Sequence, residues 1–200
     1  MLQLSSLALF FSGTALFLYQ MLWFRLLGFS ENSETATILM AFFSGLALGS
    51  LLAQWRLRKG DHGLKGFIFS QILVVISAVL LLPILISPEQ IIALSPNQQI
   101  ASWDGFVTVF VIALIPSMAM GMAFPFVTAW FAHHQPQKTS PLPYFYGLLT
   151  LGAVGAILSG GFYILPNVGL TGAIYSAAGF NLIAAFMAYL ALLKTPSKTA

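Results

Sequence analysis

The sequence predicts an all-α integral membrane protein, a six-transmembrane-helix bundle with both termini in the cytoplasm. Of its 200 residues, 58% are hydrophobic and only 6% are charged, and the mean hydropathy is +0.91. A water-soluble chain needs about a quarter of its residues charged to cover its surface, whereas a chain surrounded by lipid does not. The apolar residues also fall in runs of about 20, the length of a helix that crosses a bilayer.

Six such runs form a single membrane domain, residues 1–200. A helix rises about 1.5 Å per residue, so each run can cross roughly 30 Å of hydrocarbon. The runs are too long for the strands of a membrane barrel, which leaves helices as the structure that satisfies the backbone in lipid. The expected spans are 7–28, 34–54, 66–87, 104–131, 144–165 and 170–193.

Each of the first three spans has a recognisable boundary. Residues 7–28 form a run too long for the apolar region of a signal peptide and lack a preceding basic region, so we expect this span to be retained. The second span ends at the basic turn that starts at Arg56. The third follows the turn residues Gly60 and Gly63 and ends before Pro88.

The last three spans are separated by proline and glycine. The fourth follows the long connection 88–103 and is bounded by Pro136 at its far side. The fifth ends at Pro166, and the sixth begins after Gly169. These residues interrupt helices and therefore mark the ends of the spans.

The basic residues are sorted to one side of the six-span arrangement. Seven of the eight lie on the even-numbered connections or the C-terminal tail, and only Arg25 lies at the opposite side. Because Lys and Arg concentrate in cytoplasmic loops, this sorting predicts a multi-pass protein of the inner (plasma) membrane with cytoplasmic termini. The seven are Arg56, Arg58, Lys59, Lys65, Lys138, Lys194 and Lys198.

Composition and charge exclude several classes of function. No Asp, Glu, Lys, Arg or His lies near the middle of a span, so neither an intramembrane proton relay nor a hydrolytic triad can be assembled. The adjacent His133 and His134 lack the spacing and the partners of a metal site, and the chain has no cysteine. The basic residues do not form the concentrated face that is typical of nucleic-acid binding. We therefore expect no catalytic residue, no metal and no cofactor.

A polar cluster in the first span is the best candidate for binding. Tyr19 and Gln20 lie in the apolar run, and Arg25 lies near its outer end. One interpretation is that Arg25 extends its guanidinium to headgroups or to Glu31 and Glu34, which needs no function. The other is that these side chains line an outward-opening cavity for a polar or anionic solute. Uncharged polar residues occur in later spans: Gln71, Ser117, Thr150 and Asn181.

The fourth span should be broken. Pro116 and Pro125, with Gly121 between them, remove helix hydrogen bonds near the bilayer centre. Such breaks serve as gates or binding sites in transporters, and they also occur as static kinks. Both interpretations stay open.

Small residues indicate close packing of helices. Gly45 and Gly49 form a G-x-x-x-G motif in the second span, and Gly152, Ala156 and Gly160 share one face of the fifth. Such faces let two helix backbones approach closely in lipid. The contact is either within the chain or the interface of a homodimer.

Four motifs in order resemble the membrane domain of the fused major-facilitator-like/spermidine synthase family. They are FFSGTALFLYQMLWFRLLG in span one, AFFSGLALGSLLA in span two, LIPSMAMGMAFPF in span four and YGLLTLGAVGAILSGGFYILPNVGL in span five. The motif positions include Tyr19, Gln20, Trp23 and Arg25 in span one and Thr150 in span five, where Leu149 replaces the family's Asn. The resemblance implies a fold like half of a major-facilitator transporter.

The resemblance does not extend to the synthase. No Gly-rich nucleotide loop follows a strand in these 200 residues, so we expect no aminopropyl transfer from this chain. Two functions are expected: a small transporter or half-transporter for a polyamine-like or amino-acid-derived solute, or a non-catalytic anchor that recruits a spermidine synthase-like or methyltransferase-like enzyme. A lipid-modifying enzyme ranks last. Expected partners are the bilayer and either a second copy or that separate enzyme subunit.

Overall fold

The computed structural model describes residues 2–27, 32–60, 63–86, 103–134 and 142–194, and within these ranges every regular element is a helix. This confirms the all-α prediction. Five stretches are long and apolar enough to cross a membrane: Leu2–Arg25, Ala36–Arg58, Leu64–Leu81, Phe110–His134 and Leu142–Leu193. The sequence predicts six spans. The difference lies in the last stretch, which has 52 residues and joins the fifth and sixth expected spans.

The helices agree with the expected spans to within about six residues at each end. They are α1 (Leu2–Leu27), α2 (Asn32–Arg58), α3 (Leu64–Ile86), α5 (Trp103–Gly121), α6 (Ala123–His134), α7 (Leu142–Ser159), the π-helix η1 (Gly160–Ile164) and α8 (Leu165–Leu193). Gly60 and Gly63 after α2 have φ angles of 90° and 58°. Both lie in the left-handed region that glycine adopts without steric cost, which explains why α2 ends there.

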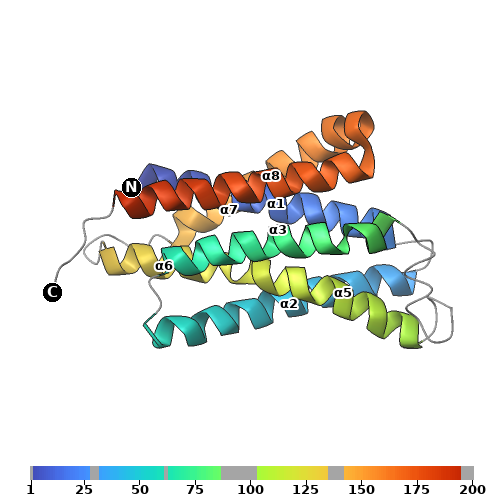
Figure 1. Ribbon diagram of the computed structural model, residues 1–200, viewed down its shortest axis with the longest axis horizontal. Coiled ribbons are helices and arrows are strands. Elements are labelled where there is room, and N and C mark those ends of the chain that lie inside the picture. The colour runs from blue at the N-terminus through green and yellow to red at the C-terminus, as the bar shows by residue number, and fades with distance from the viewer. Residues whose placement is uncertain (1, 28–31, 61–62, 87–102, 135–141, 195–200) are drawn as a thin grey trace.

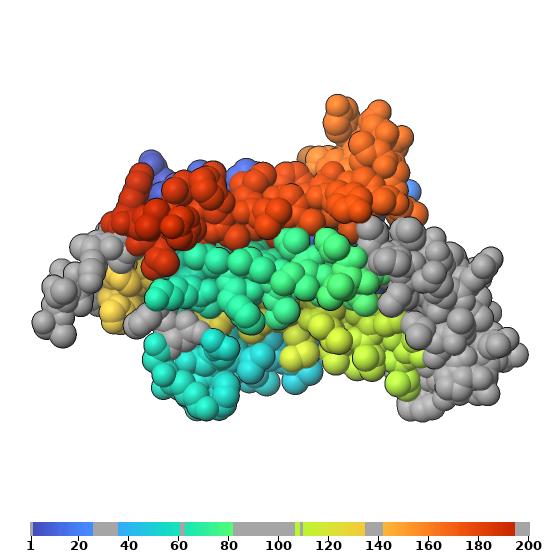
Figure 2. Space-filling model, in the orientation of Figure 1, coloured from blue at the N-terminus to red at the C-terminus, as the bar shows by residue number. Residues whose placement is uncertain are grey.

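The helices lie along one long axis and form two groups (Figure 1). In one group α1 packs against both α7 and α8, and in the other α2 packs against α5 and α6. Helix α3 joins the groups, because it packs against α8 on one side and α5 and α6 on the other. Figure 2 shows α8 and α3 side by side on the near face.

The first and last helices share an end of the bundle. The start of α1 and the end of α8 lie together in Figure 1, and so does the turn from α2 to α3. Arg56, Lys59 and Lys65 of that turn are therefore at the same end as Lys194. Arg25 is at the other end, where α1 finishes. Lys138 and Lys198 lie outside the described residues.

Two glycines hold α1 and α7 at close range. A Cβ atom on Gly13 of α1 would collide with the carbonyl oxygen of Leu149 on α7. A Cβ atom on Gly152 of α7 would likewise collide with the carbonyl oxygen of Phe10 on α1. Leu149 lies three residues before Gly152, and Phe10 lies three residues before Gly13, so the two contacts are equivalent. Ala156 is buried, and Gly160 lies against Leu18 of α1, so the small face of the fifth span packs within the chain.

The same reciprocal contact joins α2 and α5. A Cβ atom on Gly49 would collide with the carbonyl oxygen of Met118, and one on Gly121 would collide with that of Leu46. Met118 again lies three residues before Gly121, and Leu46 lies three residues before Gly49. Gly45 lies against Ser117. The G-x-x-x-G face of the second span is thus occupied by α5 of the same chain.

The stretch from α7 to α8 contains two irregularities. Residues 160–164, GGFYI, form a π-helix, and Phe162 and Tyr163 there are highly exposed. Gly169 has φ 67° and ψ −172°, a conformation essentially restricted to glycine, and it breaks α8. The chain reverses direction in this region (orange in Figure 1).

Large apolar side chains cover the outside of the bundle. Leu51, Leu80, Leu151 and Phe186 are all more than half exposed. Exposed apolar surface on this scale marks a face for a membrane or another protein. Together with the five apolar stretches, it fits a polytopic helical membrane protein.

Candidate functional site

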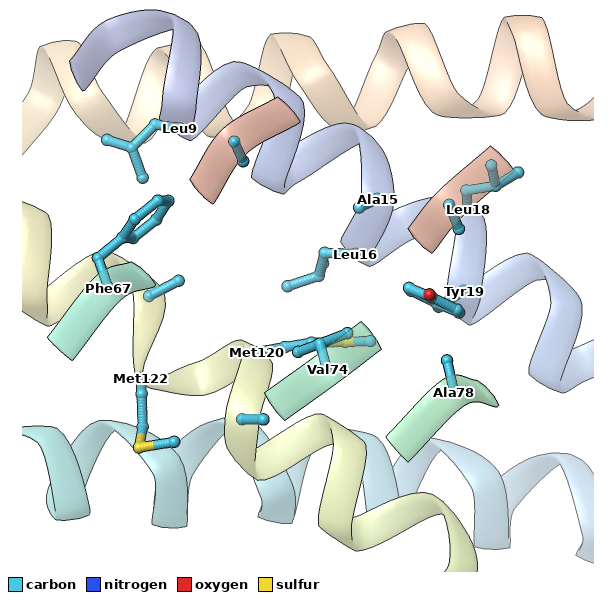
Figure 3. Close-up of a cluster of buried hydrophobic side chains, with 14 of the residues drawn as sticks. Leu9, Ala15, Leu16, Leu18, Tyr19, Phe67, Val74, Ala78, Met120 and Met122 are labelled. Carbon is cyan, nitrogen blue, oxygen red and sulfur yellow. The ribbon is translucent and has the colours of Figure 1, made fainter. Parts of the chain in front are cut away.

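A small cavity lies where the two helix groups meet. Its volume of about 10 Å³ is enough for one water molecule. Figure 3 shows Tyr19 of α1 extending into the space bordered by Val74 and Ala78 of α3 and by Met120 of α5. The full lining comes from four helices: Tyr19, Leu22, Trp23, Val74, Ala78, Pro116, Met120 and Ile174.

Four buried polar atoms in the described part of the chain have no hydrogen-bond partner. They are the Tyr19 hydroxyl, Oε1 of Gln20, Oε1 of Gln71 and Nδ2 of Asn181. Tyr19, Gln71 and Asn181 are each at most 3% exposed, whereas Gln20 is half-buried. An unpaired amide or hydroxyl costs free energy when it is buried, and lipid offers no replacement partner. These atoms therefore have unused capacity to bind a polar ligand.

Tyr19 and Asn181 connect α1 to α8 beside the cavity. The Asn181 side chain interacts with the Tyr19 hydroxyl. The two groups do not reach the distance and angle of a well-formed hydrogen bond, so both keep a free donor. A water or solute oxygen between them would satisfy both groups.

The interrupted fourth span forms another wall of the site. The helix stops at Gly121, resumes at Ala123 and leaves Met122 as a turn. Pro125 has no N–H to donate to the Gly121 carbonyl, which receives a 3.0 Å hydrogen bond from Ser50 Oγ instead. Pro116 faces the cavity directly. The break therefore lies between the site and α2.

The structure brings some of the predicted site residues together and separates others. Tyr19 and Pro116 line one cavity, and Gly121 and Pro125 belong to the break behind it. Arg25 is exposed at the far end of α1. Thr150 is exposed on α7 and donates a 2.9 Å hydrogen bond to the Tyr146 carbonyl of its own helix. Neither residue belongs to the cavity.

Arg25 was expected to reach headgroups or the acidic residues that follow α1. Its exposure leaves the guanidinium accessible to headgroups. Glu31 lies outside the described residues, and the side chain of Glu34 is not described. The cluster of Tyr19, Gln20 and Arg25 therefore divides, with Tyr19 facing the interior and Arg25 at the surface.

Gln71 and Asn181 were not among the predicted site residues; neither lines the cavity, but Asn181 contacts the lining residue Tyr19. Both lie in the middle of apolar spans, and that position was the available signal. Their importance depends on facing the interior without a partner, which the sequence does not reveal. Ser117 is also buried, but it donates to the Ala113 carbonyl at 2.7 Å and has no proton left to offer.

The site can form hydrogen bonds, and it has no group suited to proton transfer near neutral pH. No charged side chain is among the buried residues of the described ranges. Those ranges also hold no group of three His, Asp or Glu residues that could bind a metal ion. His133 and His134 are exposed in the last turn of α6, where His134 Nδ1 lies 2.8 Å from the Trp130 carbonyl oxygen.

Comparison with known proteins gives no family to guide the interpretation. No family model matches the chain, and neither the curated proteins nor the solved structures include a match. The function is therefore argued from the geometry of the site.

Proposed function

We propose that the chain is a six-span, major-facilitator-half-like transporter or half-transporter for a small polar solute. The observation that supports this function best is the pair of unpartnered buried groups on Tyr19 and Asn181, with Tyr19 lining a cavity whose wall also includes Pro116. Buried polar groups in a membrane are costly, so they favour a role in binding. Broken helices are where transporters place such sites.

The count of six spans rests on the long last stretch. Its 52 residues are more than twice the roughly 20 needed for one crossing. Gly169 breaks the helix within it, and α7 and α8 each pack along α1. Two crossings joined by a turn near residues 160–169 account for all three features.

The two glycine contacts support the likeness to a major-facilitator half. Gly13 and Gly152 join α1 to α7 in the same reciprocal way as Gly121 and Gly49 join α5 to α2. Helices α1 and α5 run in opposite directions (Figure 1). Equivalent contacts between oppositely directed segments support an inverted repeat, on which transporter motion is often built.

The chemistry of the site narrows the class of solute. The unpartnered groups are amides and a hydroxyl, and no carboxylate is buried among the described residues. Such groups favour a neutral or zwitterionic amino-acid-derived compound over a polyamine, because a buried cation needs an anionic partner. The cavity of about 10 Å³ is too small for either. Transport would require the two helix groups to separate, or a second copy to complete the path.

Reconstituted vesicles test this function. We expect uptake of a neutral amino-acid-derived solute above empty vesicles, and we expect Tyr19→Phe and Asn181→Leu to reduce it. Ser176→Ala is the matched control, because Ser176 donates only to the Gly172 carbonyl of its own helix. No uptake of any member of a panel of amino acids and polyamines would exclude transport.

A second function is a membrane anchor for a separate spermidine synthase-like or methyltransferase-like enzyme. The small volume of the cavity favours it, since about 10 Å³ is too small for a solute of this class. Native mass spectrometry after purification in mild detergent tests it. The anchor predicts a complex with one such enzyme, and recovery of the lone chain would count against it.

A further inference from the structure

A second, larger pocket opens where α2 ends and α3 begins. Its volume is about 610 Å³, much larger than that of the cavity beside Tyr19, and its lining is basic and aromatic rather than mostly apolar. Three of its residues are basic and two are aromatic. The lining is Trp55, Arg56, Lys59, Gly60, Lys65, Gly66 and Phe69. We refer to this site as the basic pocket.

Aromatic rings hold two of the cations in place. The Lys59 ammonium lies 3.6 Å from the centroid of the Trp55 ring, and the Arg56 guanidinium carbon lies 5.8 Å from that of Phe69. A cation over a ring face is attracted to it but keeps its full charge. Lys59 therefore lies at the pocket wall and still attracts an anion.

Positive charge dominates this part of the sequence. Residues 56–65 contain four basic residues, Arg56, Arg58, Lys59 and Lys65, against the single acid Asp61. Four positive charges less one negative charge leave a net charge of +3 in ten residues. Asp61 itself lies outside the described residues. This net positive charge attracts anions such as a phosphate group.

Apolar stripes lead away from the basic pocket on both helices. Leu48, Leu51 and Trp55 recur at helical spacing along α2, and all three are exposed. Phe69, Ile72 and Ile76 do the same along α3. Helices α2 and α3 are held apart, because each packs on α5 and α6 rather than on the other. Both stripes begin at an aromatic residue of the pocket wall.

We propose that the basic pocket binds the phosphate headgroup of an anionic membrane lipid, whose acyl chains lie along these two stripes. Arginine and lysine are the side chains that bind phosphate oxygens best. A pocket at the end of membrane-length helices is also at the depth of lipid headgroups. Apolar stripes beside the cations favour a lipid over free phosphate, which would gain nothing from them. This site is separate from the cavity beside Tyr19 and does not depend on transport.

Lipid titration followed by native mass spectrometry tests the proposal. The purified protein is titrated with phosphatidylglycerol, and we expect Lys59→Gln and Lys65→Gln each to weaken binding roughly fivefold, from about 1 kcal/mol per basic residue. The control is Lys194→Gln, which removes an exposed cation at the same end of the bundle but outside the pocket. The control should bind as the unmodified chain does. Both lysines of the pocket are exposed, so folding should be retained.

Four results would overturn the proposal. Equal losses in all three variants would indicate general attraction of charge, and no loss would show that the pocket is not used. Equal affinity for phosphatidylcholine would remove the preference for an anionic lipid. The last experiment is competition with inorganic phosphate. If phosphate displaces the lipid at similar concentrations, the pocket recognises phosphate alone and the acyl chains contribute nothing to binding.

Discussion

Ser50 on α2 donates a hydrogen bond to the carbonyl oxygen in the fourth span that Pro125 leaves without its helical donor. Its hydroxyl lies 3.0 Å from the carbonyl oxygen of Gly121, the acceptor that Pro125 cannot serve. The same hydroxyl lies 2.8 Å from the Leu46 carbonyl of its own helix, so one proton is shared between two acceptors. The broken helix is thus linked to its neighbour at the break itself.

Replacing Ser50 should weaken this link. Ser50→Ala is expected to lower the free energy of unfolding by about 1 kcal/mol, because the Gly121 carbonyl loses its donor in an environment without water. Thermal unfolding in detergent measures the change. Ser176→Ala, which removes a hydroxyl bonded only within its own helix, should cost less. Equal effects of the two substitutions would show that the link between helices adds nothing.

The reciprocal glycine contacts should not tolerate a methyl group. Gly49→Ala and Gly152→Ala are each expected to destabilise the protein by about 1–3 kcal/mol, since the added Cβ would overlap a carbonyl of the facing helix. Gly179→Ala is the control, because its Cβ would meet no atom within 4 Å. That helical substitution should be neutral or stabilising. Comparable losses at Gly179 would contradict the assigned packing.

Replacement of Gly169 should destabilise the protein through the backbone conformation rather than through steric overlap. Gly169→Ala places a Cβ in open space, but the backbone has φ 67° and ψ −172°. This region is closed to other residues and costs about 1–3 kcal/mol to impose. Chemical denaturation in detergent would measure the loss. An unchanged midpoint would mean that the turn adopts another conformation.

The cavity beside Tyr19 permits a test that separates binding from stability. Tyr19→Phe removes a buried hydroxyl that has no partner, so unfolding should occur at the same or a higher temperature. Leu22→Ala, at another wall of the same cavity, should lower stability by about 2–5 kcal/mol because it enlarges a void. Loss of uptake in Tyr19→Phe without loss of stability would assign the hydroxyl to the solute. A large destabilisation by Tyr19→Phe would show that the hydroxyl is bonded after all.

The arrangement of spans can be measured with single cysteines, because the chain has none of its own. Lys59→Cys and Lys194→Cys should react with a membrane-impermeant reagent from the same side of oriented vesicles. Asn167→Cys should react from the other side, since its exposed position lies near the turn between α7 and α8. Labelling of all three from one side would exclude six crossings.

The helical membrane class and the places where helices break follow from the amino-acid sequence alone. Runs of about 20 apolar residues leave a helix as the stable structure in lipid, and Pro125 and Gly169 act on the backbone next to them. These are local effects, so they can be read without knowing the fold. The expected spans and the described helices accordingly coincide closely, apart from the joined last stretch.

The contacts between residues of different helices follow from the packing of the helices. The spans are apolar on every side, so their sequences carry little information on which face turns inward. The packing of α1 against α8 brings Tyr19 to Asn181, while Thr150 and Arg25, which seemed equally suitable by residue type, face outward. Contacts between helices depend on the close approach of backbones at glycines such as Gly13 and Gly49, and that approach is a property of helix pairs rather than of any one segment.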